Sequence, residues 1–184
     1  AAVDEGLIAG PRLFIAGKAI ASFAARVLMS AYPERLRERF KLTASDAAAE
    51  DRFGFAVSTN GTLIAVSAPY DDDRGDASGS VYLFNATTGA FVRKIFASDA
   101  GVNDQFGIAV DLVGNLLAIG AWGDNDGAGS VYVFDVTTGA QLGKFAASDG
   151  VPNDILGRAV ALSRTGAIAG AAIGGTGWSV VQRY

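Results

Sequence analysis

Gly79-Ser-Val-Tyr-Leu-Phe84 and Gly129-Ser-Val-Tyr-Val-Phe134 are two nearly identical stretches in one chain. Each leads into a Thr-Thr-Gly segment, which closes a turn with Gly89 or Gly139 in the left-handed position. Both stretches are apolar at consecutive positions, which is typical of strands in sheets that are covered on both faces. The sequence is therefore organised as an internal repeat of β-strands.

The repeat extends in both directions from these two stretches. A Lys-to-Asp hexapeptide comes before an apolar-Gly pair in three copies, and the apolar-Gly pairs are Phe53-Gly54, Phe106-Gly107 and Leu156-Gly157. The Lys-to-Asp hexapeptides are Lys41-Leu-Thr-Ala-Ser-Asp46, Lys94-Ile-Phe-Ala-Ser-Asp99 and Lys144-Phe-Ala-Ala-Ser-Asp149. In the first copy, Asn60-Gly61 predicts a type I′ hairpin, because both central residues of that turn need positive φ. Each unit thus contains four short strands separated by turns.

Four strands in about 50 residues is the size of a propeller blade. We expect an all-β repeat array of three four-stranded, β-propeller-like units at about 39–96, 97–146 and 147–184, preceded by an N-terminal α-helix within 1–38. The array opens at 39–42 with the equivalent of a blade's last strand, so we expect this N-terminal strand to complete the last unit. Three blades are fewer than the four to eight of ordinary propellers. The array is therefore either a compact three-sheet form or an open one whose end faces meet another chain.

The repeat resembles the FG-GAP repeat, which is named for its Phe-Gly and Gly-Ala-Pro elements. Phe53-Gly54 carries the first element, and Ser67-Ala68-Pro69 carries the second with serine in place of glycine. The resemblance covers residues 39–184. It implies blades like those in the propellers of integrin α subunits, and it is a strong indication of fold but a poor one of function.

Calcium is the ligand that the resemblance suggests, because integrin blades hold calcium in the hairpin between their first two strands. Here that hairpin is only 58–62 or 111–115, with too few oxygen ligands for a cation that takes six to eight. The family's calcium residues therefore do not carry over. Acidic residues later in the unit are the remaining candidates for weak calcium binding, against the alternative of solvated turns. They are Asp71, Asp73, Asp76, Asp124 and Asp126.

Composition excludes several catalytic classes. The chain has no histidine and no cysteine, so serine–histidine, cysteine–histidine and zinc-hydrolase chemistry is excluded. A carbohydrate-active enzyme would need two opposed carboxylates, but Asp51, Asp104 and Asp154 recur with the repeat. We therefore expect these three to cap the loop before each apolar-Gly pair, with no catalytic residues and no cofactor.

Charge is distributed unevenly along the chain, whose net charge is −4. The first 42 residues are basic and the remainder is acidic, and an acidic body argues against nucleic-acid binding. The chain starts Ala1-Ala2-Val3, which fits either a processed signal-type leader or a truncated sequence.

The N-terminal segment carries the strongest prediction about partners. Pro11 suits a helix start and Tyr32-Pro33 a helix end. Within this helix the polar residues gather on one arc and all other positions are apolar. It can lie in a membrane interface, dock in a partner's groove, span a bilayer at the cost of burying Lys18 and Arg26, or pack on its own array. The residues predicted to dock are Arg12, Leu13, Phe14, Lys18, Ile20, Phe23, Arg26, Val27 and Leu28.

The resulting prediction is a structural subunit, bound through this helix to a membrane or membrane-protein complex and to other protein subunits. An extracytoplasmic or organelle-lumen location fits, the thylakoid lumen included, as does an accessory subunit of an algal photosynthetic or respiratory supercomplex. That placement rests on analogy with FG-GAP-like repeats of unicellular eukaryotes. The alternatives are an extracellular, calcium-assisted adhesion or ligand-binding module and a carbohydrate-active enzyme.

Overall fold

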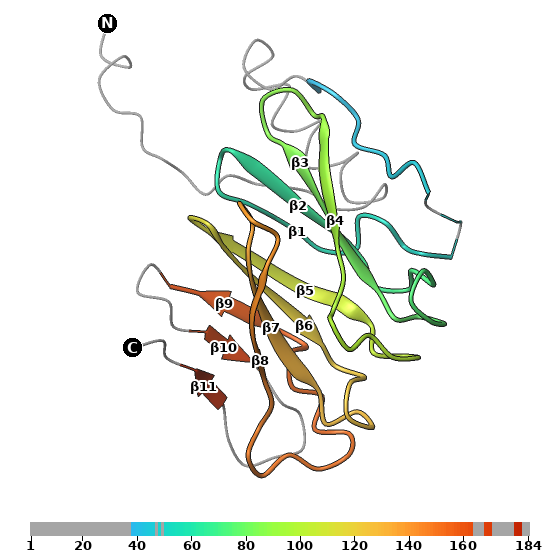
Figure 1. Ribbon diagram of the computed structural model, residues 1–184, viewed down its shortest axis with the longest axis vertical. Helices are drawn as coiled ribbons and strands as arrows, with labels where there is room; N and C mark the ends of the chain where they lie inside the picture. The colour runs from blue at the N-terminus through green and yellow to red at the C-terminus, as the bar shows by residue number, and fades with distance from the viewer. Residues whose placement is uncertain (1–37, 47, 49, 164–167, 171–178, 182–184) are drawn as a thin grey trace, which may run out of the picture.

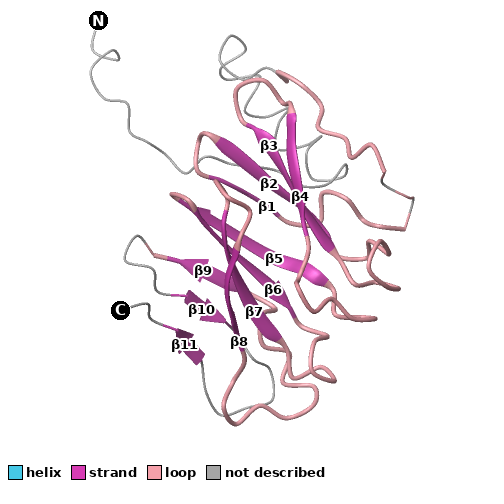
Figure 2. Ribbon diagram, in the orientation of Figure 1, coloured by secondary structure: helices cyan, strands magenta, loops and turns pink. Residues whose placement is uncertain are grey.

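The computed structural model describes residues 38–46, 48, 50–163, 168–170 and 179–181, and in this part of the chain all regular structure is β-strand (Figure 2). The first sheet contains β1 (Val57–Thr59), β2 (Leu63–Ala68), β3 (Ser80–Asn85) and β4 (Phe91–Ile95). The second sheet contains β5 (Phe106–Val113), β6 (Leu116–Ala121), β7 (Ser130–Asp135) and β8 (Gln141–Phe145). The third contains β9 (Val160–Leu162), β10 (Ile168–Gly170) and β11 (Ser179–Val181). The four-stranded units predicted for the first two copies are confirmed.

The first two sheets have the same construction. In both, antiparallel strands follow one another in chain order, and the last pair contains a β-bulge, after Leu83 in one sheet and after Val133 in the other. Gly89 (φ 72°) and Gly139 (φ 79°) close the turn into the last strand, as the Thr-Thr-Gly pattern predicted. Identical turn chemistry therefore produces the same strand register in both units.

The three sheets are stacked, with the second sheet between the first and the third (Figure 1). The largest core cluster lies between the first and second sheets and includes Val81, Leu83, Phe106 and Leu117, each fully buried. Smaller clusters lie on the outer face of the first sheet and between the second and third sheets. Strands β2, β3, β6 and β7 are thus buried on both faces, which explains why their sequences are apolar at consecutive positions.

Backbone hydrogen bonds join the first sheet to the second. Gln105 has a positive φ of 53°, and its N–H donates to the carbonyl of Ala77 at 3.0 Å. The N–H of Phe106 donates to the carbonyl of Ser78, also at 3.0 Å, and Phe106 forms a parallel bridge with Gly79. We call this arrangement the junction.

The same junction joins the second sheet to the third. Ile155 has a φ of 53°, and its N–H donates to the carbonyl of Gly127 at 2.9 Å. The N–H of Leu156 donates to the carbonyl of Ala128 at 2.9 Å, and Leu156 bridges Gly129. The apolar-Gly pairs of the second and third units therefore fix each of these units to the one before it.

The predicted fourth strand of the last unit is wrong. Residues 39–42 form no strand, and the third sheet consists of β9, β10 and β11. Phe40, Leu42 and Ala44 instead pack on the outer face of the first sheet. Leu42 and Ala44 there correspond in the repeat to Ile95 and Ala97, which pack between the first and second sheets. The segment thus keeps the contact that its equivalents make with the following sheet.

The predicted type I′ turn at Asn60-Gly61 is also wrong. Gly61 has a positive φ of 91°, but Asn60 does not. The side-chain oxygen of Asn60 instead accepts the N–H groups of Thr62 (2.9 Å) and Leu63 (2.8 Å). Asparagine therefore shapes this loop by side-chain hydrogen bonding rather than by its tolerance of a left-handed backbone.

The predicted N-terminal helix lies outside the described residues. Among the residues that the structure describes, no helix has the length and apolar character needed to cross a bilayer.

Candidate functional site

A largely buried lysine lies among acidic side chains at the edge of the first sheet. The Nζ of Lys94, on β4, lies 2.6 Å from carboxylate oxygens of Asp71 and of Asp73 and 2.9 Å from one of Asp46. The hydroxyl of Tyr82 donates to Asp46 (3.0 Å) and Asp71 (2.9 Å). Asp71 is only 2% exposed, so its charge is balanced inside the protein rather than by water.

The second sheet repeats this arrangement. The Nζ of Lys144 lies 2.7 Å from Asp99 and 2.6 Å from Asp124. The hydroxyl of Tyr132 donates to both carboxylates at 3.0 Å. We call the two groups, Lys94 with its partners and Lys144 with its partners, the lysine clusters. Because Asp46 and Asp99 come from the segment that precedes each sheet, the clusters also attach that segment to the sheet.

The ionisation of the first lysine cluster follows from these contacts. Burial acts to raise the pKa of Asp71, but the hydrogen bond from Lys94 and bonds from Asp73 N–H, Ser80 and Tyr82 outweigh it and hold that pKa below its usual value. Burial acts to lower the pKa of Lys94, but its bonds to Asp71, Asp73 and Asp46 raise it above the usual value. Burial raises the pKa of Tyr82, and its carboxylate partners add to the effect. The cluster is therefore a stable ion pair with a neutral tyrosine, not a proton donor poised near neutral pH.

The recurring aspartates before the apolar-Gly pairs are loop caps, as the sequence predicted. The carboxylate of Asp51 accepts the N–H of Ala48 at 2.7 Å. Asp104 accepts from Gly101 at 2.6 Å, and Asp154 accepts from Val151 at 2.8 Å. All three aspartates are buried, and burial raises the pKa of Asp51 and of Asp104. Their separation into one per unit leaves no opposed carboxylate pair of the kind that glycoside hydrolysis needs among these three.

The calcium candidates do not converge on one site. Asp71 and Asp73 contact Lys94, and Asp124 contacts Lys144, while Asp76 and Asp126 are exposed. Within the described ranges, no group of three or more acidic side chains is arranged to hold a metal ion. A calcium ion would have to displace a lysine ammonium from a close ion pair, so these residues fit the ion poorly. Calcium binding by them stays a prediction.

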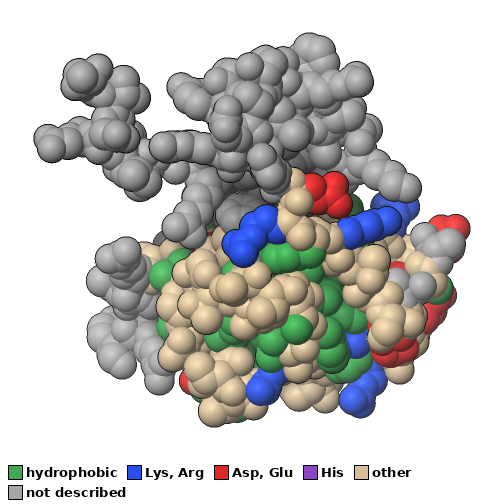
Figure 3. Space-filling view, turned by 90° about the horizontal axis from the view of Figure 1, so that it is seen from above, with side chains coloured by type: hydrophobic (Ala, Val, Ile, Leu, Met, Phe, Trp, Pro, Cys, Tyr) green, Lys and Arg blue, Asp and Glu red, His purple; other side chains and the backbone are tan. Residues whose placement is uncertain are grey.

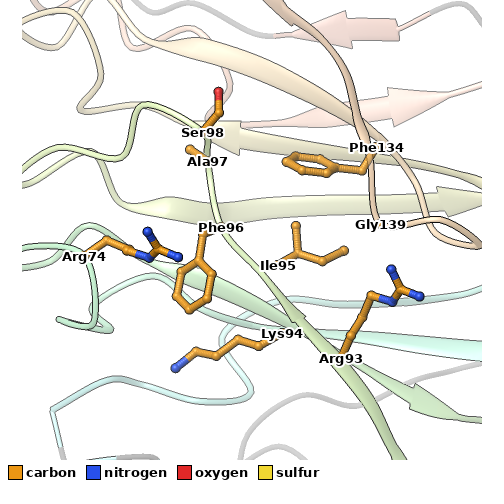
Figure 4. A pocket seen from close by; sticks show the side chains of 9 residues that line it. All are labelled: Arg74, Arg93, Lys94, Ile95, Phe96, Ala97, Ser98, Phe134 and Gly139. Atoms are coloured by element: carbon orange, nitrogen blue, oxygen red, sulfur yellow. The ribbon is translucent and has the colours of Figure 1, made fainter.

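A groove lies between β4 and the turn that joins β7 to β8 (Figure 4). Its volume is about 330 Å³, and its lining includes Arg74, Arg93 and Lys94 but no acidic side chain. Arg74 points toward the ring of Phe96, with its guanidinium 4.9 Å from the ring centroid (Figure 4). Arg93 donates to the carbonyl of Thr137 at 3.2 Å, while its buried Nε has no hydrogen-bond partner within the described residues. The ammonium of Lys94 is compensated by its carboxylates, so the positive charge that the groove offers to an acidic ligand comes from Arg74 and Arg93.

The first sheet is at one end of the stack of described sheets, with the segment at 38–46 against part of its outer face. Seen from that end, hydrophobic side chains lie at the surface between Lys and Arg side chains, with Asp and Glu gathered at one side (Figure 3). Phe55 (45% exposed) and Phe91 (57%) belong to this unit. A surface with apolar side chains framed by charge is suited to binding another protein.

Sequence reasoning missed the two lysine clusters, although it used their lysines to align the repeat. The sequence pattern that could have revealed the clusters is the recurrence of the Lys-to-Asp hexapeptide together with a tyrosine, Tyr82 or Tyr132, in each of the first two units. It also missed Asp111, which accepts a hydrogen bond from Ser58 of the first sheet (3.3 Å) and from the N–H of Leu162 in the third (2.7 Å). The predicted docking residues between Arg12 and Leu28 lie outside the described residues.

Comparison with known families agrees with the repeat geometry. The sequence model of the FG-GAP repeat matches residues 36–84 and 90–134, which together make up just over half of the chain. These stretches contain most of the first two units, including the segment at 38–46 and both buried tyrosines. Among curated proteins, no relative matches the chain.

Proposed function

Because the chain belongs to the FG-GAP repeat family, we propose that it is a non-enzymatic interaction subunit, attached to a membrane or membrane-protein complex through its N-terminal segment. FG-GAP repeats are typically interaction or adhesion modules of extracellular and lumenal proteins. On this proposal the β-array presents binding surfaces to other subunits, and the basic, apolar segment at 12–28 provides the attachment.

One observation carries the non-enzymatic part of the proposal. The buried aspartates of the described residues are engaged in the same contacts from unit to unit, either in a lysine cluster or as a loop cap. A catalytic centre needs a residue whose environment differs from that of its repeat equivalents. Here Asp71 matches Asp124, and Asp51 matches Asp104 and Asp154, so the buried acids act as structural ties.

The attachment follows from the sequence of the segment itself. Lys18 and Arg26 lie on one side of the expected helix, and Phe14 and Phe23 belong to its apolar side. An anionic lipid surface or an apolar groove rimmed by acidic residues would complement this distribution. A thylakoid or respiratory complex is one setting of this kind.

Removal of residues 1–33 tests the proposal in cells of the source organism. We expect the full chain to sediment with membranes and to co-migrate with a larger assembly in mild detergent, and the shortened chain to become free. The matched variant Phe14→Gln/Phe23→Gln should also release the chain, whereas Lys41→Gln, in the described array, should not. A full-length chain that migrates alone as a monomer contradicts the proposal.

A further inference from the structure

The first sheet carries one half of a junction that has no counterpart among the residues that the structure describes. Arg52 has a φ of 54°, the same left-handed conformation as Gln105 and Ile155 at 53°. In the two junctions inside the chain, the N–H of that residue and of the next donate to the preceding sheet. Within the described residues, the N–H groups of Arg52 and Phe53 have no such acceptor. We call Arg52–Phe55 the leading edge of the first sheet.

Glycine geometry shows that the leading edge is open. A Cβ at Gly107 (φ 98°) would lie 2.9 Å from the carbonyl oxygen of Ser80 on the preceding sheet. A Cβ at Gly157 (φ 90°) would lie 2.3 Å from the carbonyl oxygen of Ser130. Gly54 has the same conformation (φ 92°), yet nothing in the described part of the chain lies within 4 Å of its Cβ position. The left-handed glycine is thus retained where no neighbouring backbone requires it.

The exposure of the apolar residues agrees with this. Phe106 (0% exposed) and Leu156 (2%) are covered by the preceding sheet, whereas their equivalent Phe53 is only half-buried. The apolar side chain two residues later is also more exposed in the first unit, since Phe55 is 45% exposed and its equivalent Ile108 is 9% exposed. The leading edge therefore leaves apolar surface open that the two internal junctions bury.

The two internal junctions define what can bind there. The bound strand must begin with glycine, because a Cβ at Gly79 or Gly129 would lie 2.1 Å from the carbonyl oxygen of Phe106 or Leu156. The two residues before that glycine must offer their carbonyls to the incoming N–H groups. In both junctions the glycine is followed by the serine that starts the third strand of the sheet, Ser80 or Ser130. The partner's requirement is therefore a third strand that starts Gly-Ser.

The chain has no spare strand of that kind. Its sequence contains Gly-Ser only at Gly79-Ser80 and Gly129-Ser130, and both are occupied by its own junctions. In the third sheet Gly170 pairs with Ser179, as Ile119 pairs with Tyr132 in the second sheet, so the residue that corresponds to Gly129 is Thr176 rather than glycine. A threonine at that position carries the Cβ that the close backbone approach excludes, so neither this chain's last unit nor that of a second copy meets the requirement.

We propose that the leading edge binds the open side of a further FG-GAP blade, one that is not among residues 1–184 and whose third strand begins with Gly-Ser. Its two carbonyls accept the N–H groups of Arg52 and Phe53, and its backbone packs over Gly54. This partner also covers the exposed ring of Phe55. The proposal does not depend on attachment through the N-terminal segment.

A chain that carries its own probe blade tests this inference. Residues 47–92 are duplicated directly in front of residue 40, so that the duplicate supplies three strands in phase and the segment at 40–46 follows them as the fourth. We expect the amides of Arg52 and Phe53 to exchange at least about tenfold more slowly than in the parent chain, approaching Gln105 and Phe106. As the matched control, the duplicate's copy of Gly79 is replaced by valine, which should abolish the added protection while the duplicate's own core amides stay protected.

A second readout uses Gly54→Ala. In the parent chain this substitution should lower the unfolding temperature less than Gly107→Ala, because only the latter brings Cβ against a neighbouring sheet. In the extended chain the two substitutions should have similar effects. Three results would overturn the inference: Arg52 and Phe53 already protected in the dilute parent chain, protection that grows with parent concentration, or unchanged exchange beside a folded duplicate. The first means that the chain covers its own edge, and the second that a second copy does.

Discussion

At the scale of single residues, the lysine clusters are positions where loss of one side chain should destabilise the fold. Lys94 compensates two carboxylates at 2.6 Å, one of which belongs to the buried Asp71. Removing one partner of a buried pair leaves an uncompensated charge, and the loss is larger than the pair's own net contribution. Lys41, the equivalent lysine in the segment before the first sheet, is exposed and makes no ion pair within the described residues.

Lys94→Met should therefore lower the free energy of unfolding by about 3 kcal/mol, because Asp71 keeps its burial but loses its cation. Lys41→Met should change it by less than about 0.5 kcal/mol. Urea denaturation of both variants measures the difference. Equal effects of the two substitutions would show that the ion pair is not formed.

The pH dependence of stability should follow the same clusters. The lowered pKa of Asp46, Asp71 and Asp99 means that their contribution is present above the ordinary carboxyl pKa of about 3.9 and is lost as the pH falls through their folded values. The raised pKa of both lysines and both tyrosines means that their contribution is present below about pH 10 and is lost as the pH rises further.

Denaturation midpoints measured from pH 2 to 12 should thus fall at both ends. Asp51 and Asp104 act against this loss of stability at low pH. Because their pKa is raised in the folded state, they take up protons there above about pH 3.9 as the pH falls, and this favours the folded state. The acid limb should therefore begin only below pH 4, and the alkaline limb near pH 10. A midpoint that declines steadily between pH 5 and pH 9 would contradict these assignments.

Residue-level prediction from sequence worked where a residue's partner is close in the chain. The loop caps at Asp51, Asp104 and Asp154 bind an N–H three residues earlier, and their recurrence at equivalent places in the repeat was enough to predict this role. The partners of Lys94 lie on the neighbouring strand, on the loop before it and on the segment preceding the sheet, and composition could not identify them. Asp111 contacts two other sheets, which no local pattern encodes.

At the scale of elements, runs of consecutive apolar residues and turn chemistry predicted the strands well. The apolar runs at Leu63–Ala68 and Ser130–Asp135 are buried on both faces, and the Thr-Thr-Gly turns have left-handed glycines. The hairpin at Asn60 was predicted incorrectly because asparagine has two ways to shape a turn, and only the structure distinguishes them. The repeat alignment likewise could not decide which sheet residues 39–42 join. The segment aligns with a fourth strand whether it completes the third sheet or packs on the first.

At the scale of the whole molecule, the described units form an open stack rather than a closed ring. The first and third sheets lie on opposite sides of the second, and the segment at 38–46 lies beyond the first (Figure 1). Sequence predicted the units and the number of strands in the first two, but closure depends on contacts between the ends that repeat phase does not determine. The openness gives the molecule its available surfaces, the leading edge of the first sheet among them.

Distance measurement between the ends tests this openness most directly. The chain contains no cysteine, so spin labels can be placed at single introduced cysteines, at Thr43 with Thr88 and at Thr43 with Ala161. In the open stack, Thr43 is about three layers from Ala161, or roughly 30 Å at about 10 Å per layer, and much nearer Thr88. If residues 39–42 instead completed the third sheet, Thr43 would be three strands from β9, roughly 15 Å away. Pulsed electron paramagnetic resonance should show the longer distance to Ala161, and the shorter one would contradict the account.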